Sequence, residues 1–240
     1  METPKQIDST TASLLPSPNT SSGLVLYALG SATVTSALSQ SKRAALYDSF
    51  ASFPSHHFLV KTSADDWWSR NYTAGAGNIV MAEWWPQADL LGDDRMKVFI
   101  THAGYNSVVE SALRGVPMLS VPLFFDQFRN AKAAEWAGYS LTLEKGALAD
   151  RQQVTLALRE LMTNPVYGQR ARKLAGMMTD RRKGSEALAE GIAWVLKVRR
   201  DDGSERFLRL KGDWGMGLVG FLHLDLIAAL TVLVVVLYMA

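Results

Sequence analysis

The sequence contains no cysteine. This absence excludes disulfide bonds, thiolate metal ligands and cysteine nucleophiles, so any chemistry must come from other side chains. The chain also carries little net charge, because 25 Lys and Arg against 23 Asp and Glu leave a formal charge of +2. A charge this small creates no strong field for a polyanion, and no aromatic residues interleave with the basic clusters. The sequence therefore predicts no nucleic-acid partner.

Long apolar runs are also scarce in the sequence. Residues 1–22 are rich in Ser, Thr and Pro and have no run long enough for a signal peptide, which predicts a disordered leader. Residues 218–240 are the exception: about 23 nearly uninterrupted apolar residues would form a helix of roughly 34 Å. This length predicts a single transmembrane helix, with a buried core helix as the alternative. A globular domain is expected over residues 23–200 and a linker over residues 201–217.

Within residues 23–200, short apolar runs alternate with turn residues and helical stretches, which is typical of an α/β fold with a parallel sheet. After Asp150 the pattern is wholly helical, without further strand-like runs. Asp150 is expected to be the N-cap of the first of these helices, with Gln153 completing a capping box. These patterns predict a Rossmann-like, doubly wound parallel sheet followed by helices. The predicted strands are 24–29, 58–61, 78–82, 97–101, 117–121 and 140–143, and the predicted helices between them are 36–52, 86–91, 107–114 and 127–136.

The segment from the fourth predicted strand into the next helix has the pattern of an anion site. His102-Ala103-Gly104-Tyr105-Asn106-Ser107 forms a glycine-containing turn, which can present backbone N–H groups and the positive end of a helix dipole to a phosphate. Structural alternatives exist for each residue. Ser107 and Glu110 fit a capping box, and His102 fits a hydrogen-bonded structural histidine. Likewise, Trp84 and Trp85 fit the core, and Asp126 fits the N-cap of the following helix.

The order and spacing of four motifs add a family resemblance. Residues 83–91 (EWWPQADLL), 99–110 (FITHAGYNSVVE), 115–117 (GVP) and 122–130 (PLFFDQFRN) resemble the signature of the UDP-glycosyltransferases, especially the animal UDP-glucuronosyltransferases. The resemblance covers roughly residues 24–198. It implies that the predicted sheet is the donor-binding, C-terminal domain of a GT-B glycosyltransferase.

The resemblance also implies roles for individual residues. Trp84 would stack on the uracil, Glu110 would accept hydrogen bonds from the ribose, and His102 would help hold the diphosphate at the helix N-terminus. A UDP-sugar is then a co-substrate, and neither a cofactor nor a metal is implied, in keeping with the lack of an acidic or His-rich metal motif. The full set of donor-binding residues implied is Ser31, Trp84, Gln87, His102, Gly104, Asn106, Ser107, Glu110, Asp126 and Gln127.

Two of the implied subsites lie outside that turn. Asp126 and Gln127 would bind hydroxyl groups of the transferred sugar. Ser31, with Gly30 at the end of the first strand, would form a second loop on the phosphate side.

The implied reaction is transfer of a sugar from a UDP donor to a small lipophilic acceptor, with inversion at the anomeric carbon. In the family, a general-base histidine lies in a separate N-terminal domain that forms most of the acceptor pocket. No segment of this sequence matches that domain, so the catalytic base is not assigned and a partner is expected to be needed for turnover. The alternatives are a non-catalytic donor-binding or regulatory membrane subunit, acting with a partner chain or as a homo-oligomer, and an inactive fragment that still folds.

The resemblance further implies a single-pass protein of the endoplasmic reticulum membrane. The side on which the domain lies is left open. Basic residues such as Arg206 and Lys211 precede the apolar segment and favour the cytosol, whereas sequons at Asn19 and Asn71 could be glycosylated only in the lumen.

Overall fold

A computed structural model of the 240-residue chain describes residues 9–17, 22–30, 35–179, 186 and 188–193. The chain divides into two compact units after Arg181. In the second unit, residues 186 and 188–193 are helical. Over the described ranges, the helices are all too short or too polar to cross a membrane. The predicted linker at 201–217 and transmembrane segment at 218–240 lie outside these ranges.

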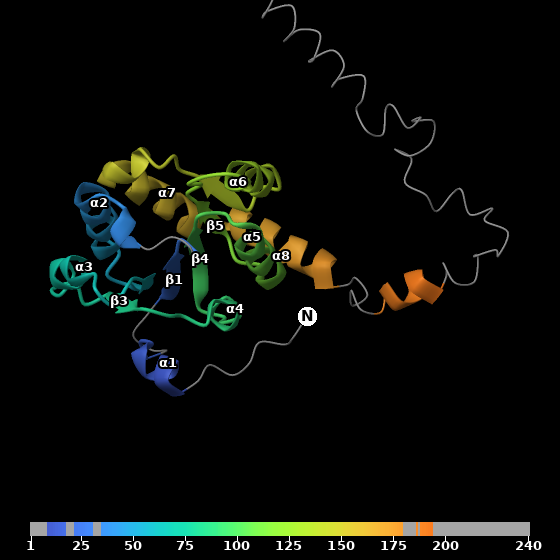
Figure 1. The fold of residues 1–240 in the computed structure, drawn as a ribbon, viewed down its shortest axis with the longest axis horizontal. Coiled ribbons are helices and arrows are strands. Elements are labelled where there is room, and N and C mark those ends of the chain that lie inside the picture. The colour runs from blue at the N-terminus through green and yellow to red at the C-terminus, as the bar shows by residue number, and fades with distance from the viewer. Residues whose placement is uncertain (1–8, 18–21, 31–34, 180–185, 187, 194–240) are drawn as a thin grey trace, which may run out of the picture. The chain divides into compact units, whose positions relative to one another are not determined.

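A six-stranded, fully parallel sheet forms the centre of the first unit (Figure 1). Its strand order is β3-β2-β1-β4-β5-β6, which confirms the predicted Rossmann-like, doubly wound sheet. In this order the winding direction reverses between β1 and β4, and ligands of such sheets bind beyond the carboxyl ends of the strands at that point. The strands are β1 Gly23–Ala28, β2 His56–Lys61, β3 Ile79–Ala82, β4 Met96–Thr101, β5 Met118–Ser120 and β6 Ser140–Thr142.

Helices connect the strands and cover both faces of the sheet (Figure 1). Helices α2 and α7 contribute to the core on one face, and α4, α5, α6 and α8 contribute to the core on the other. The helical elements are α1 Ser9–Leu14, η2 Thr35–Ala37, α2 Gln40–Ala51, α3 Trp67–Tyr72, α4 Gln87–Leu90, α5 Tyr105–Arg114, α6 Gln127–Trp136, η3 Ala147–Ala149, α7 Arg151–Thr163 and α8 Pro165–Thr179.

The two cores follow from the alternation of side chains along the central strands. On β1, Val25 and Tyr27 pack into the core under α2 and α7, whereas Leu24 and Leu26 pack into the opposite one. All six residues of β1 are buried, as expected for a central strand covered on both faces. The sheet is therefore a rigid base from which the loops at its carboxyl edge project.

The N-terminal segment corrects one prediction. Residues 1–22 are predicted to be a disordered leader, yet Ser9–Leu14 form α1. The reason is tertiary: Leu15 packs against the core that includes Leu24, and Nη1 of Arg95 donates a 2.9 Å hydrogen bond to the carbonyl oxygen of Pro16. Two contacts from distant parts of the chain thus hold a segment whose composition favours disorder.

Candidate functional site

A cavity of about 640 Å³ opens at the carboxyl edge of the sheet, beyond the ends of β1 and β4, where the winding direction reverses. Its lining comes from four segments that are separated in the sequence: the end of β1, the end of β2, the β3–α4 connection with the start of α4, and the β4–α5 turn with the first turns of α5. Seven predicted donor-binding residues meet there: Trp84, Gln87, His102, Gly104, Asn106, Ser107 and Glu110. The predicted anion turn therefore lies where a doubly wound sheet binds its ligand.

The imidazole of His102 is held between two glycines in the cavity wall. A Cβ atom placed on Gly30 would lie 2.6 Å from Cε1 of His102, and one on Gly104 would lie 2.5 Å from Nε2. Gly30 also has φ of +91°, a left-handed conformation that favours glycine. Nδ1 of His102 lies 3.3 Å from Oγ1 of Thr101. Both glycines therefore leave the room that the ring occupies.

Burial favours the neutral form of the His102 ring. It lowers the pKa of His102 below the usual 6.5, and the Lys61 ammonium lowers it further, although the carboxylate of Asp126 acts in the opposite direction. A neutral imidazole has one N–H donor and one acceptor nitrogen. The ring can therefore donate a hydrogen bond to a phosphate oxygen without itself being charged.

The N-terminus of α5 corrects the capping-box alternative. The helix begins at Tyr105 with Gly104 at the N-cap, so Ser107 is the third helical residue and not the cap. Gly104 has no side chain to accept from the first-turn amides, which leaves their N–H groups free to bind an anion at the positive end of the helix dipole. Ala103, just before the cap, has φ of +61°, an uncommon value for a residue with a Cβ.

Gln87 joins the α4 side of the cavity to α5. Its Nε2 donates a 2.7 Å hydrogen bond to Oε2 of Glu110 and lies 3.4 Å from Oγ of Ser107. Glu110 therefore faces the cavity with one oxygen held by Gln87 and with acceptor capacity remaining for a ligand hydroxyl.

The two adjacent tryptophans have different environments. Trp85 is 3% exposed and belongs to the core, whereas Trp84 is 71% exposed and lines the cavity. The core alternative is therefore correct for Trp85 and wrong for Trp84. An exposed indole face at the edge of a cavity can stack on a planar base.

Lys61 is a cavity residue that the sequence reasoning missed. It is the last residue of β2, its Nζ donates a 3.0 Å hydrogen bond to the carbonyl oxygen of Gly30, and it lies 5.2 Å from the centre of the Trp84 ring. Lys61 thus brings a positive charge beside the residues expected to hold an anionic ligand. Its position follows from the pairing of β1 with β2, which no local motif indicates.

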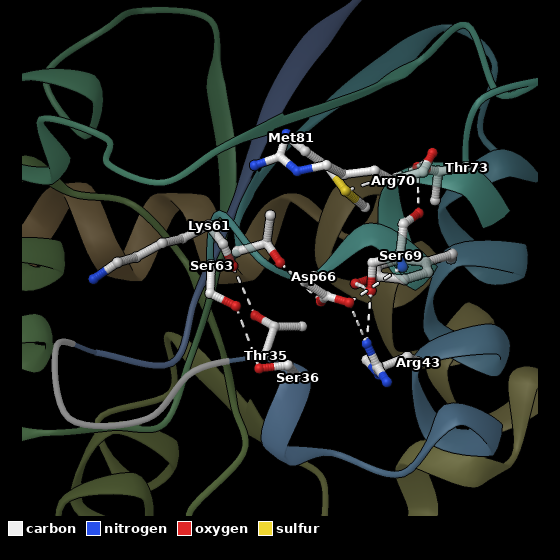
Figure 2. A network of polar contacts seen from close by, with 12 residues as sticks. Thr35, Ser36, Arg43, Lys61, Ser63, Asp66, Ser69, Arg70, Thr73 and Met81 are labelled. Atoms are coloured by element: carbon white, nitrogen blue, oxygen red, sulfur yellow. Dashed lines mark hydrogen bonds and ion pairs between the residues drawn. The ribbon is translucent and has the colours of Figure 1, made fainter.

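A buried polar network holds the chain around Lys61 (Figure 2). Oγ1 of Thr35 donates a 2.7 Å hydrogen bond to the Lys61 carbonyl, and Oγ1 of Thr62 donates a 2.9 Å bond to Asp66. Asp66 pairs with Arg43 of α2 at 2.5 Å, and both side chains are almost fully buried. Burial raises the pKa of Asp66, but the hydrogen bonds from Ser69, Thr62 and Arg43 together outweigh it and hold the pKa below the usual value.

The predicted sugar-binding pair lies where the loop after β5 meets α6, and neither residue lines this cavity. Asp126 is exposed, and its Oδ2 accepts a 2.7 Å hydrogen bond from Nδ2 of Asn130; it occupies the N-cap position of α6 without capping the helix. Gln127 is 5% exposed, and its Oε1 accepts hydrogen bonds from the backbone of Leu123 and Phe124. Ser31 lies outside the described residues.

The four histidines of the sequence are not equivalent. His56 and His57 begin β2, at the amino edge of the sheet and opposite the cavity, and His223 lies outside the described residues. Among described residues, no three His, Asp or Glu side chains form a group that could hold a metal ion. The cavity as described is lined by hydrogen-bond donors, one cation (Lys61), two carboxylates (Asp89 and Glu110) and an exposed aromatic face.

Comparisons with known proteins show similarity in sequence and in fold. The sequence profile of the family described as "UDP-glucoronosyl and UDP-glucosyl transferase" matches residues 6–240. Human UDP-glucuronosyltransferase 1A9 is 32% identical over 182 residues, which are 76% of this chain and 32% of that protein. The Caenorhabditis elegans protein ugt-48, which carries a UDP-glucuronosyltransferase name, is 33% identical over 207 residues, or 85% of this chain and 38% of its own length. The chain thus spans about a third of the length of these relatives.

Solved structures show the same fold. Os79 from O. sativa, in complex with U2F and trichothecene, superposes with a TM-score of 0.58 at 21% identity over 72% of this chain and 40% of that one. The spinosyn forosaminyltransferase SpnP superposes with a TM-score of 0.62 at 18% identity over 73% of this chain and 44% of that one. Both likenesses concern the architecture of the sheet and its helices.

Proposed function

This chain belongs to the UDP-glucoronosyl and UDP-glucosyl transferase family, and from that membership we propose that its cavity binds a UDP-sugar donor. The sugar would pass, with inversion, to a small lipophilic acceptor. The observation that supports this proposal best is the convergence of Trp84, His102 and Glu110 on one cavity at the switch point of the sheet.

The uridine would lie on the α4 side of the cavity. Trp84 offers its exposed ring to the uracil, at about 1 to 3 kcal/mol for such a stack, and the Gln87 segment reaches the edge of the base. Glu110, oriented by Gln87, would accept hydrogen bonds from the ribose hydroxyl groups.

The diphosphate would lie at the N-terminus of α5. The free amides of the first turn and the neutral ring of His102 would donate to its oxygens, with Asn106 and Ser107 beside them. Charge develops on UDP as the bond to the sugar breaks, so donors already in place would stabilise the transition state more than the ground state. Asp126 and Gln127 would contact the sugar, Gln127 chiefly by holding the loop.

Turnover also requires removal of the acceptor's proton. His102 is assigned to the phosphates, and His56 and His57 lie at the opposite edge of the sheet, so the general base is proposed to come from a separate acceptor-binding domain. Since the chain spans about a third of its relatives, the whole reaction is proposed to need that second part, on the same or a partner chain.

Metal independence and membrane attachment are further proposals. Undiminished transfer in EDTA would support a metal-free reaction, whereas activity lost in EDTA and restored only by a divalent cation would contradict it.

An anchor at residues 218–240 in the endoplasmic reticulum membrane predicts that the chain resists extraction from microsomes at alkaline pH. Release into the soluble fraction would contradict it.

The donor site is tested by calorimetric titration of UDP into the 240-residue chain and its Trp84→Ala variant. Loss of the stacking partner should weaken binding about 5- to 150-fold. Trp136→Ala is the matched control, because Trp136 is 93% exposed at the end of α6 and does not line the cavity. Equal UDP affinity in the two variants would contradict the stacking role of Trp84.

A further inference from the structure

The loop between β5 and α6 and the first turn of α6 expose three phenylalanines, Phe124, Phe125 and Phe128, here called the aromatic rim. Their side chains are 40%, 86% and 54% exposed. The rings of Phe124 and Phe125 pack edge to face, with their centres 5.2 Å apart. Single exposed apolar residues are ordinary, but three exposed aromatic side chains within five positions of the chain form a patch.

The aromatic rim lies next to the donor cavity. Asn130 of α6 connects the two, because its Nδ2 donates to Oδ2 of Asp126 at 2.7 Å and to the carbonyl oxygen of Ala103 at 3.2 Å. Ala103 directly follows His102, and the charge of Asp126 is close enough to act on the His102 ring. The start of α6, with Asp126 and Asn130, therefore lies beside the His102–Ala103 turn that forms the phosphate end of the cavity, and the aromatic rim flanks Asp126 in the sequence.

The loop that carries Phe124 and Phe125 is held by hydrogen bonds to α6. Oε1 of the buried Gln127 accepts hydrogen bonds from the backbone N–H groups of Leu123 and Phe124, at 2.8 and 3.1 Å. Phe125 has a φ of +54°. Among the described non-glycine residues, only Phe125 and Ala103 have a positive φ. Asn130 bonds to the carbonyl of Ala103 and to the side chain of Asp126, the residue that follows Phe125.

The left-handed backbone of Phe125 and the exposure of its ring both disfavour the folded state. A left-handed backbone is unfavourable for a residue with a Cβ, and an aromatic ring left in water gains nothing from burial. Strained residues of this kind concentrate at ligand-binding sites. A ring held in such a position is available for an external apolar group.

The size of the aromatic rim favours a small ligand over a protein. Three phenylalanines at these exposures offer roughly 350 Å² of surface, whereas each side of a stable protein interface buries about 800 Å². A flat molecule of one or two fused rings could be covered by this area. The neighbouring cavity and Asp126 would then lie beside its polar end.

We propose that the aromatic rim binds the apolar body of a small, flat, hydroxyl-bearing molecule, and that Phe125 is its principal contact. The assignment of that molecule as the sugar acceptor rests on the proposed function. Binding of the apolar body does not, because it depends on the aromatic rim alone.

The test is titration of 1-naphthol, followed by its fluorescence, into the 240-residue chain with and without saturating UDP. Phe125→Gly removes the ring and also relieves the left-handed backbone, so this variant should fold at least as well as the parent. Phe125→Tyr keeps an aromatic face. Trp136→Ala is the control for general loss of an exposed aromatic residue on the neighbouring helix.

We expect 1-naphthol to bind the parent chain, with affinity lowered about fivefold or more in Phe125→Gly and changed less than twofold in Phe125→Tyr and Trp136→Ala. UDP affinity should stay within twofold in all three. No binding to the parent, or equal binding in Phe125→Gly, would overturn the proposal. Self-association of the parent, seen by sedimentation and abolished in Phe125→Gly, would also overturn the proposal. The aromatic rim would then be a contact between protein molecules. If UDP fails to bind the parent, the donor proposal fails, while the 1-naphthol titration still decides the aromatic rim.

Discussion

Nε2 of Gln87 donates a 2.7 Å hydrogen bond to Oε2 of Glu110, which connects the start of α4 to the second turn of α5 across the wall of the cavity. The two residues are 23 positions apart in the sequence. Their contact orients the carboxylate that is proposed to bind the ribose, and it links the base end of the site to the phosphate end.

Replacing Glu110 by Ala should therefore weaken UDP binding. Loss of a charge-assisted hydrogen bond to the ribose predicts a decrease of about 1.5 to 3 kcal/mol in binding free energy, measured by calorimetry. Glu144→Ala removes an exposed glutamate from another loop and should leave the affinity unchanged. Equal affinity in the two variants would show that Glu110 only supports Gln87.

The two glycines that flank His102 should not tolerate a methyl group. Gly30→Ala and Gly104→Ala each place a Cβ within 2.6 Å of the imidazole. The ring must move, so UDP affinity should decrease, and strain should reduce the free energy of unfolding by about 1 to 3 kcal/mol. Gly146→Ala is the control, because a Cβ there meets nothing within 4 Å. If urea unfolding shows the same stability in all three variants, the cavity wall is less tightly packed than described.

Stability should decrease as the pH falls below about 6.5, in part through His102. Burial holds the pKa of His102 in the folded chain below the usual 6.5, so the unfolded chain binds more protons once the pH falls below that value. The free energy of unfolding then decreases until the pH passes the folded pKa, and above 6.5 the residue has no effect. His56 and His57 also have lowered pKa values and contribute in the same direction.

The contribution of His102 is isolated by its Gln variant. Urea unfolding between pH 7.5 and pH 5 should show a smaller loss of stability in His102→Gln than in the parent, because the variant retains only the other histidines. A loss of equal size in both would mean that His102 is protonated as easily in the folded chain as in the unfolded one.

The buried pair Arg43–Asp66 should matter far more to stability than an exposed ion pair. Arg43→Met leaves the Asp66 carboxylate buried without its cation, which predicts a loss of about 3 to 5 kcal/mol in the free energy of unfolding. Lys132→Ala breaks the exposed pair with Glu135 and should cost less than about 1 kcal/mol. Similar losses in the two variants would mean that the network behind Lys61 is open to water.

The strands could be predicted from the sequence because each is a short apolar run bounded by turn residues. All six occur within two residues of the predicted bounds, and α6 matches its prediction at both ends. Helix α3, in contrast, was missed, because Trp67–Tyr72 has no apolar periodicity. It is fixed by Asp66, whose side chain caps the helix by accepting from the Ser69 amide while pairing with Arg43 of another helix.

The candidate site could be predicted where one segment carries it. His102, Ser107 and Glu110 follow one another on a turn and its helix, so their common location was readable from spacing. The place of Lys61 in the site could not be predicted from the sequence, because only strand pairing brings it close to Gly30 and Trp84. The capping-box alternative was wrong because the helix begins two residues before Ser107, at Tyr105, which the left-handed turn at Ala103 and the extended backbone of Gly104 permit.

The central claim is that uridine and diphosphate occupy adjoining parts of one cavity, and calorimetric titration of uridine, UMP and UDP into the 240-residue chain tests it most directly. If the N-terminus of α5 and His102 hold phosphates beside a base on Trp84, affinity should increase stepwise from uridine to UMP to UDP. The increase from uridine to UDP should be much smaller in His102→Ala. Equal affinities for uridine and UDP, or no binding of UDP by the folded chain, would contradict the account.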